Sequence, residues 1–289
     1  MAWLALLIAA LVAVPILSVG ANLLRGGGGD TWRHLADTVL PSYIGNTLIL
    51  CVAVACGAIL IGVATAWLVS AHTFPGCAIF EWALVLPLAV PAYVMAYTYT
   101  DLLQFVGPVQ TWLREAMGWQ GGQYWFPDVR SVGGAALMFV CVLYPYVYLL
   151  ARAAFLERAS GILEVGSSLG LGPWRSFWRL SLPLARPAIA TGAALALMET
   201  LADYGTVSYF GVPTFTTGIY RAWFALGDRV AAAQLAAALL GCVALVLFVE
   251  HASRGRARFN NTSGRKRALS GRRLRGGAAL AACLTCLLG

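Results

Sequence analysis

The chain has 289 residues, of which 60% are apolar and only 11% are charged, and its mean hydropathy is +0.76. This composition excludes a water-soluble fold, because a soluble domain of this length could not cover so many apolar side chains. The net charge of +8 therefore has to be explained within a membrane protein. Such a chain is counted in membrane spans of about 20 residues rather than in soluble domains.

Six apolar runs are each long enough to cross a bilayer, and they cover residues 2–24, 44–70, 79–103, 132–150, 187–210 and 230–249. The first run could be a signal peptide, but it lacks a basic start and a clear cleavage site. A seventh run opens at Ala278 and reaches Gly289, too short to cross about 30 Å of hydrocarbon, so we expect the sequence to stop inside a helix. With no alternating barrel pattern, the sequence predicts an all-α polytopic membrane protein with six transmembrane helices and the start of a seventh.

The third run contains two prolines, Pro87 and Pro91, which remove backbone donors and predict a kink. Glu81 and Asp101 fall near its two ends, where solvated or capping roles are expected. The segment that follows, 104–130, carries three tryptophans and is predicted to lie at the outer membrane interface. A contact with a substrate-delivery protein is the other interpretation of this segment.

The segment 152–189 is polar enough to lie in water, yet its apolar and aromatic residues recur in a regular pattern. Its first part predicts a helix, and Gly and Pro at 170–173 predict a turn before a second, short helix. The second helix carries an aromatic and basic set: Trp174, Arg175, Phe177 and Trp178. Such a set is typical both of docking into the groove of a partner and of lying at a membrane interface, and the residues alone do not decide between them.

Five residues in this segment keep a fixed spacing: Glu164, Gly170, Leu180, Leu182 and Pro183. The spacing resembles the loop signature of ABC importer permeases, E-A-A, three residues, Gly, nine residues, I-x-L-P. The chain departs from it at Val165 and Gly166, where the family usually has two alanines, and at Leu180, where it has isoleucine. The resemblance implies a coupling loop at 152–186 that docks on a cytoplasmic ABC ATPase dimer, and Gly172, Trp174, Arg175, Phe177 and Trp178 are assigned to it as well.

The fifth run contains two carboxylates, Glu199 and Asp203, which the i, i+4 spacing places on one helix face. Each costs about 2.5 to 3.5 kcal/mol at the centre of a lone membrane helix, so both should face protein or water. Two interpretations stay open. The carboxylates either lie near the outer interface and bond neighbouring helices, or line a translocation path in which hard oxygen ligands suit a hard cation, with Tyr204 beside them.

Basic residues fall mainly on one side of the predicted spans. Five arginines lie between spans four and five, and nine basic residues follow span six, from Arg254 to Arg275. The positive-inside tendency makes this side cytoplasmic and places the N-terminus there as well. The basic segment 251–276 is interpreted as a cytoplasmic linker beside anionic lipid headgroups rather than as a nucleic-acid site.

Cysteine and histidine spacing does not predict a metal centre. Cys283 and Cys286 form a C-x-x-C, but no further pair of ligands stands nearby to complete a zinc site. No Gly-rich loop ending in Gly-Lys-Ser/Thr is present, so we expect the chain not to hydrolyse ATP. The sequence predicts no catalytic residues and no bound cofactor, with ATP used by a partner subunit.

Two longer segments, 198–224 and 91–108, are similar to those of ferric iron importer permeases. Permeases for thiamine, sulfate, phosphonate compounds and polyamines share the scaffold. The resemblance implies an ATP-driven, binding-protein-dependent importer of the bacterial inner membrane, with ferric iron as the favoured cargo and a secondary transporter as the rival. Family iron permeases commonly carry two six-span halves, so residues 1–250 are expected to be one half, 251–276 a linker and 277–289 the start of the next span. Whether the second half is a further part of the chain or another subunit stays open.

Overall fold

The computed structural model describes residues 2–21, 37–168, 172–254 and 272–288. This part of the chain is almost entirely helical, which confirms the predicted all-α membrane fold. Five of its helices contain stretches long and apolar enough to cross a membrane: α1 (Ala2–Ala21), α3 (Leu40–Ala71), α7 (Val132–Ser168), α9 (Leu182–Ala202) and α12 (Arg229–Ser253). A pair of helices bent by 98° raises this number to six when the pair is counted as one broken span.

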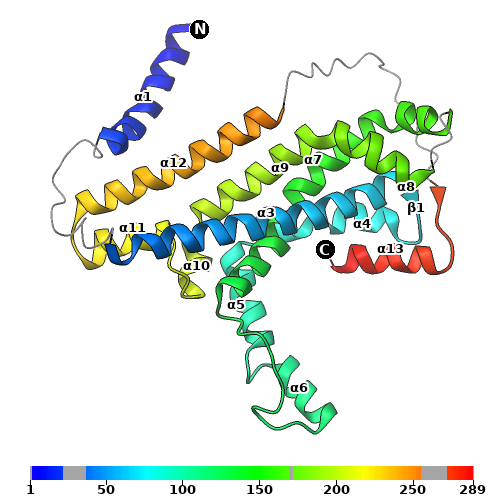
Figure 1. Ribbon diagram of the computed structural model, residues 1–289, viewed down its shortest axis with the longest axis horizontal. Helices are drawn as coiled ribbons and strands as arrows, with labels where there is room; N and C mark the ends of the chain where they lie inside the picture. The colour runs from blue at the N-terminus through cyan, green and yellow to red at the C-terminus, as the bar shows by residue number, and fades with distance from the viewer. Residues whose placement is uncertain (1, 22–36, 169–171, 255–271, 289) are drawn as a thin grey trace.

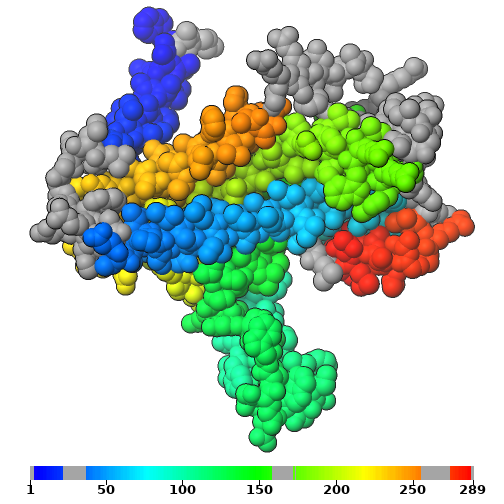
Figure 2. Space-filling model, viewed as in Figure 1, coloured from blue at the N-terminus to red at the C-terminus, as the bar shows by residue number. Residues whose placement is uncertain are grey.

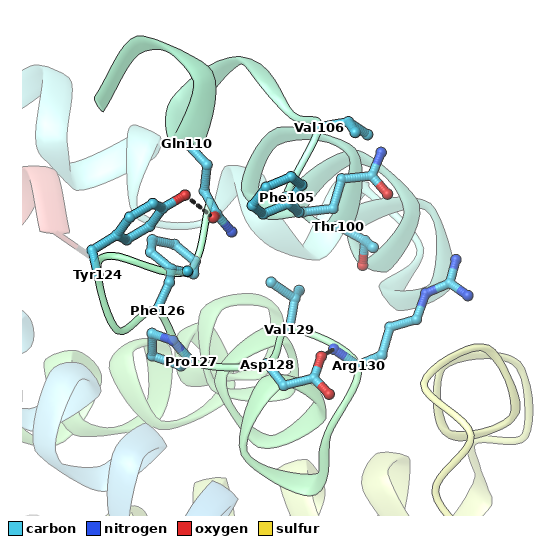
Figure 3. Close-up of a pocket in the computed structure, with 12 residues that line it drawn as sticks. Thr100, Phe105, Val106, Gln110, Tyr124, Phe126, Pro127, Asp128, Val129 and Arg130 are labelled. Carbon is cyan, nitrogen blue, oxygen red and sulfur yellow. Dashed lines mark hydrogen bonds between the residues drawn. The ribbon is translucent and has the colours of Figure 1, made fainter. Parts of the chain in front are cut away.

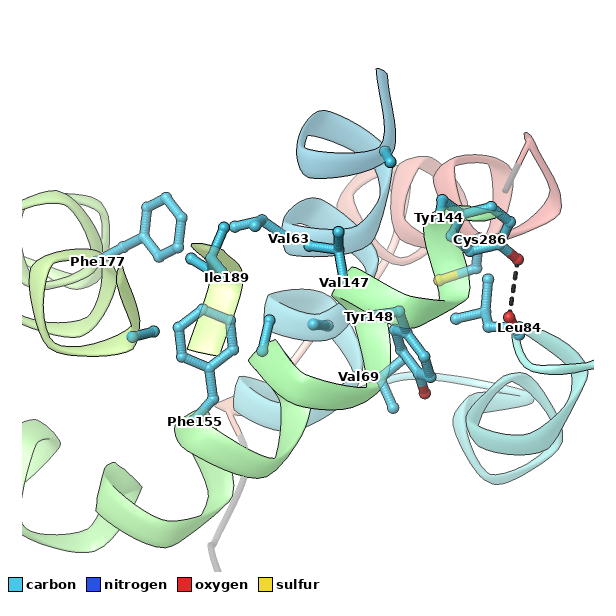
Figure 4. Close-up of a cluster of buried hydrophobic side chains, with 14 of the residues drawn as sticks. Val63, Val69, Leu84, Tyr144, Val147, Tyr148, Phe155, Phe177, Ile189 and Cys286 are labelled. Carbon is cyan, nitrogen blue, oxygen red and sulfur yellow. Dashed lines mark hydrogen bonds between the residues drawn. The ribbon is translucent and has the colours of Figure 1, made fainter. Parts of the chain in front are cut away.

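The body of the molecule is a bundle in which α3, α7, α9 and α12 run side by side (Figure 1). α7 is central to it, and Tyr144, Val147 and Tyr148 on this helix are completely buried (Figure 4). Backbones approach closely there, since a Cβ at Gly62 of α3 or Gly192 of α9 would lie within 3 Å of Val147 atoms. Small residues at such crossings are typical of helix packing in membranes.

The third span is broken, as the two prolines predict. It consists of α4 (Cys77–Ala83), the 3-10 helix η1 (Leu86–Ala89), α5 (Ala92–Leu103) and α6 (Pro108–Met117), and its two parts meet at a bend of 98°. α7 satisfies carbonyls that face the break: the Tyr144 hydroxyl donates to the oxygen of Leu84 at 3.0 Å, and the Tyr148 hydroxyl to that of Glu81 at 3.1 Å. The Glu81 carboxylate also pairs with Arg152 at 2.7 Å. Non-helical backbone at membrane depth is tolerated where protein covers it in this way.

α5 and α6 lead out of the bundle into an arm, residues 92–131, that projects from the body of the molecule (Figure 2). α1 contacts α12 and otherwise projects away from the bundle (Figure 1), and its apolar window is exposed. Both elements present large apolar side chains, which lipid or further protein can cover in a membrane.

The fifth span begins differently from the prediction. α8 (Pro173–Ser176) and the π-helix η2 (Phe177–Ser181) run directly into α9, so the expected separate short helix is wrong. Pro183 follows closely after η2, and the wider π-helical turn accommodates a residue that has no backbone N–H to donate. On the other side of the predicted turn α7 runs unbroken to Ser168, so the segment 152–186 consists largely of helix extensions.

The remaining elements are short. α10 (Gly205–Tyr209), α11 (Phe215–Tyr220) and the π-helix η3 (Arg221–Ala225) connect α9 to α12. β1 (His72–Thr73) pairs in parallel with β2 (Arg272–Arg273), and this pair leads into α13 (Gly277–Leu288). α13 lies against α3, and its Ala279, Ala282 and Cys286 join the cluster around Tyr144 (Figure 4).

Candidate functional site

Where the chain enters α9, one aromatic side chain, Phe177, is buried, and two others, Trp174 and Trp178, are exposed. Phe177 is buried and packs on Trp67 of α3, with ring centroids 4.8 Å apart, and on Phe155 of α7 at 6.4 Å. Trp174 and Trp178 are 67% and 53% exposed and contact each other edge-to-face at 5.9 Å. Phe177 thus fixes the helix to the bundle, while the two tryptophans form an apolar surface that faces away from it.

The π-helix η2 determines the directions in which these aromatic side chains point. Its bond from the Leu182 N–H to the Phe177 carbonyl spans five residues rather than four, which turns the following side chains relative to a regular α-helix. Arg175 and Arg179 are exposed beside the tryptophans, and Leu182 packs against the core. A rigid helix start with exposed aromatic and basic side chains is suited to insertion into a groove of another protein.

The other residues assigned to coupling are placed only in part. Gly172 is exposed, Leu180 is half-buried and Pro183 is the second residue of α9. Glu164 lies in the last turns of α7, where only the backbone is described, and Gly170 lies outside the described residues. The described residues therefore place the second part of the predicted motif, from Gly172 onwards.

α9 ends at Ala202, and Asp203 is its C-cap, with an extended backbone and an N–H that donates to the Glu199 carbonyl at 3.0 Å. The Glu199 carboxylate lies near enough to contribute to the raised pKa of Asp203, so the two acids remain neighbours at this end of the helix. The Asp203 carboxylate accepts bonds from the N–H groups of Thr206 and Val207, at 2.8 and 3.2 Å, and from the Thr206 hydroxyl at 3.1 Å. Burial raises the pKa of this carboxyl, which lies just beyond the spanning helix, and these hydrogen bonds oppose the rise. Asp203 thus holds the turn from α9 into α10.

Glu199 is exposed on the surface of α9, one turn after the exposed Leu195. The Tyr146 side chain of α7 lies close enough to interact electrostatically with the Glu199 carboxylate. Tyr204 is also exposed and stacks on Tyr220, with ring centroids 4.5 Å apart. The structure therefore leaves one carboxylate of the predicted pair, Glu199, accessible to a solute.

The arm contains a hollow of about 510 Å³ between α5, α6 and residues 122–130 (Figure 3). Its wall is held by buried Gln110, whose amide donates to the Leu103 carbonyl at 2.7 Å and accepts from the Tyr124 hydroxyl at 2.7 Å. Arg114 in turn donates to Tyr124 at 2.9 Å and lies over the Phe105 ring. The hollow is thus a defined surface feature rather than a gap between loose loops.

We expect Tyr124→Phe to loosen the arm, because it leaves the Gln110 oxygen and the Arg114 guanidinium without a shared partner. The expected cost is about 1 to 2 kcal/mol of local stability, measured as roughly tenfold faster amide exchange over residues 104–130. Tyr93→Phe is the matched control, since the Tyr93 hydroxyl makes no hydrogen bond within the described residues. Equal exchange in the two variants would contradict the assigned role of Tyr124.

Sequence reasoning missed the Gln110–Tyr124 pair, the Tyr146–Glu199 contact and the position of Arg130, whose guanidinium lies 4.9 Å from the centroid of the Tyr209 ring. All three join residues that are distant along the chain or separated by a turn, and no local pattern signals them. Across the described residues, no group of three or more His, Cys, Asp or Glu side chains is arranged to hold a metal ion.

The amino-acid sequence is similar to those of several transport system permease proteins. The chain is 29% identical over 257 residues to the Fe(3+)-transport system permease protein FbpB 2 of Haemophilus influenzae, covering 88% of this chain and 46% of that protein. It is 32% identical over 182 residues to the probable sulfate transport system permease protein cysT of Chlorokybus atmophyticus, with coverage of 62% and 59%. A third relative is the molybdenum transport system permease protein ModB of Escherichia coli, 31% identical over 180 residues, with coverage of 60% and 76%. The chain thus spans about half the length of the first two.

A solved structure shares the fold at low sequence identity. It is a bacterial ABC transporter involved in the import of the acidic polysaccharide alginate, with a TM-score of 0.65, 17% identity and coverage of 88% of this chain and 96% of that one. Residues 58–257 match the family described as the binding-protein-dependent transport system inner membrane component. The chain belongs to this family of inner membrane transport components.

Proposed function

We propose that the chain forms one half of the permease of an ATP-driven, binding-protein-dependent importer, and that a cytoplasmic ABC ATPase dimer docks on Trp174 and Trp178. The observation that supports this most is the anchored Phe177 with two exposed tryptophans at the end of the bundle. The ATPase activity resides in the partner, and this chain supplies the path. The N-terminus is on the cytoplasmic side, in line with the basic residues from Arg254 onwards.

The favoured cargo is ferric iron. Glu199 supports this choice, because a carboxylate in a low-dielectric path attracts a hard cation and repels sulfate or molybdate. The similarity to an Fe(3+)-transport permease points the same way, while the sulfate and molybdenum relatives make oxyanion import the second candidate. Tyr204 and Tyr146 contribute polar surface beside the carboxylate. Asp203 acts mainly by holding the turn that positions Tyr204.

Two further partners are proposed for exposed surfaces of the molecule, one for the arm and one for α9. The arm, with its hollow and the exposed Trp112 and Trp125, is the proposed contact for the substrate-binding protein on the outer face. A second permease half, from the same chain or from another subunit, covers the exposed face of α9 and closes the path around Glu199. Transport then follows from a rigid-body movement of α8 and η2, which carry the docking tryptophans, when the ATPase dimer closes.

We expect Glu199→Gln to lower ATP-dependent uptake of ferric iron about tenfold, equivalent to about 1.4 kcal/mol of lost stabilisation along the path. Stimulation of the ATPase by the loaded binding protein should persist, since the docking surface is untouched. Asp37→Asn is the control, because Asp37 is an exposed acid that lies before α3. Unchanged iron uptake by the Glu199 variant would remove Glu199 from the path, and a rise in sulfate uptake by this variant would favour the oxyanion candidate.

A further inference from the structure

A separate hollow of about 630 Å³ lies where the end of α3 meets the start of α13. These two segments adjoin in the fold although about two thirds of the chain separates them in sequence (Figure 1). The hollow is lined by Thr73, Phe74, Pro75, Leu274, Arg275, Gly276 and Ala279. None of these residues belongs to the coupling surface, the path or the arm.

The walls of the hollow are tied together by backbone contacts. β1 and β2 pair in register, and the Leu274 N–H donates to the Thr73 carbonyl at 2.9 Å. On the other side the Cys283 thiol contacts the Pro75 carbonyl at 3.4 Å. Phe74 is 7% exposed and packs in the main core cluster. The hollow is therefore a fixed feature of the α3–α13 junction.

The position of the hollow matches the boundary between hydrocarbon and water. The apolar helix α3 ends at Ala71, and the apolar helix α13 begins at Gly277, so both chain segments leave the apolar layer at this point. Phospholipid headgroups occupy this level of a bilayer. The apolar walls formed by Phe74, Pro75 and Leu274 face a region where glycerol and the first acyl carbons lie.

The charge of the hollow is positive. Arg275 is exposed at its lining, which contains no acidic side chain, and no acid within the described residues forms an ion pair with it. Arg272 and Arg273 precede it directly in β2. A guanidinium offers a planar set of donors that matches phosphate oxygens, and basic pockets beside membrane helices are typical of anionic lipid recognition.

We propose that this hollow binds the phosphate of an anionic phospholipid headgroup, with Arg275 donating to the phosphate oxygens and Phe74, Pro75 and Leu274 contacting the glycerol and upper acyl chain. The bound lipid bridges the end of α3 and the start of α13. This site is distinct from diffuse attraction of the basic linker to the membrane, because it depends on one arginine at a fixed position. It is also independent of the cargo.

The test uses the full permease in nanodiscs, with retained phosphatidylglycerol counted by native mass spectrometry after mild delipidation. Arg275→Gln is expected to lower retention about fivefold, the effect of one lost juxtamembrane arginine contact, while Arg275→Lys keeps most of it. Arg265→Gln, which removes the same charge from the linker, is the matched control and should retain lipid as the parent does. Unchanged thermal unfolding of the Arg275 variants would show that the fold is intact.

Three results would overturn the proposal. An equal loss in the Arg265 and Arg275 variants would show only diffuse attraction by the linker. Equal retention of phosphatidylcholine would show that the headgroup charge is not recognised. Displacement of the lipid by millimolar inorganic phosphate would identify a site for free phosphate rather than for a headgroup.

Discussion

Replacing both Trp174 and Trp178 by alanine is expected to lower stimulated ATP hydrolysis and uptake more than tenfold while the permease stays folded. Both side chains are more than half exposed, so their loss costs little folding stability. Buried aromatic anchors at protein interfaces are worth about 2 kcal/mol or more each, which accounts for the size of the effect. The measurements are co-purification of the ATPase and ATP hydrolysis stimulated by the loaded binding protein.

Two further variants separate docking from folding. Trp82→Ala removes a tryptophan that is 79% exposed on α4 and outside the coupling loop 152–186, and it should leave coupling unchanged. Phe177→Ala removes the buried anchor and should lower both the thermal unfolding midpoint and the coupling. If the double tryptophan variant keeps full ATPase stimulation, the docking surface has been assigned to the wrong side chains.

Gly192→Leu is expected to prevent assembly of the bundle. A Cβ at this position would lie 2.7 Å from the Val147 Cα and 3.0 Å from the Tyr146 carbonyl oxygen, and these are backbone atoms that cannot rotate away. Overpacking costs about 1 to 3 kcal/mol when side chains can adjust, and more when backbone has to move. We expect loss of monodisperse protein after extraction in detergent, with Gly62→Leu giving the same result from the α3 side.

Gly241→Leu provides the control for this prediction. Gly241 lies within α12, and nothing is found within 4 Å of an added Cβ there. The variant carries the same added bulk and the same gain in helix propensity, so it should purify as the parent does. Normal yields of the Gly192 variant would show that α7 and α9 are less closely packed than described.

Structural features that depend on neighbouring residues in the sequence could be predicted. The apolar runs predicted the spans, and Pro87 and Pro91 predicted the break in the third one, because proline removes donors wherever it occurs. The end of α9 was also readable in principle. Asp203 competes for backbone N–H groups, and Gly205 follows it, a pattern typical of turns rather than of a continuing helix.

Features that depend on packing between distant segments were not predictable. The entry into α9 was expected to be a separate short helix, but Phe177 is buried against α3 and α7, and this contact keeps the chain helical. The arm depends on a hydrogen bond between Gln110 and Tyr124, and the docking of α13 depends on pairing of β1 with β2. Side-chain spacing within a segment contains no information about such partners.

The most direct test of the central claim is ATP-driven uptake by the reconstituted importer. The full permease, its ATPase and its binding protein are placed in proteoliposomes, and radioactive ferric iron, sulfate and molybdate are offered separately with and without ATP inside. We predict accumulation of ferric iron only, and only with ATP. Uptake of iron without ATP would contradict coupling to an ATPase, and ATP-dependent uptake of sulfate or molybdate in place of iron would contradict the cargo.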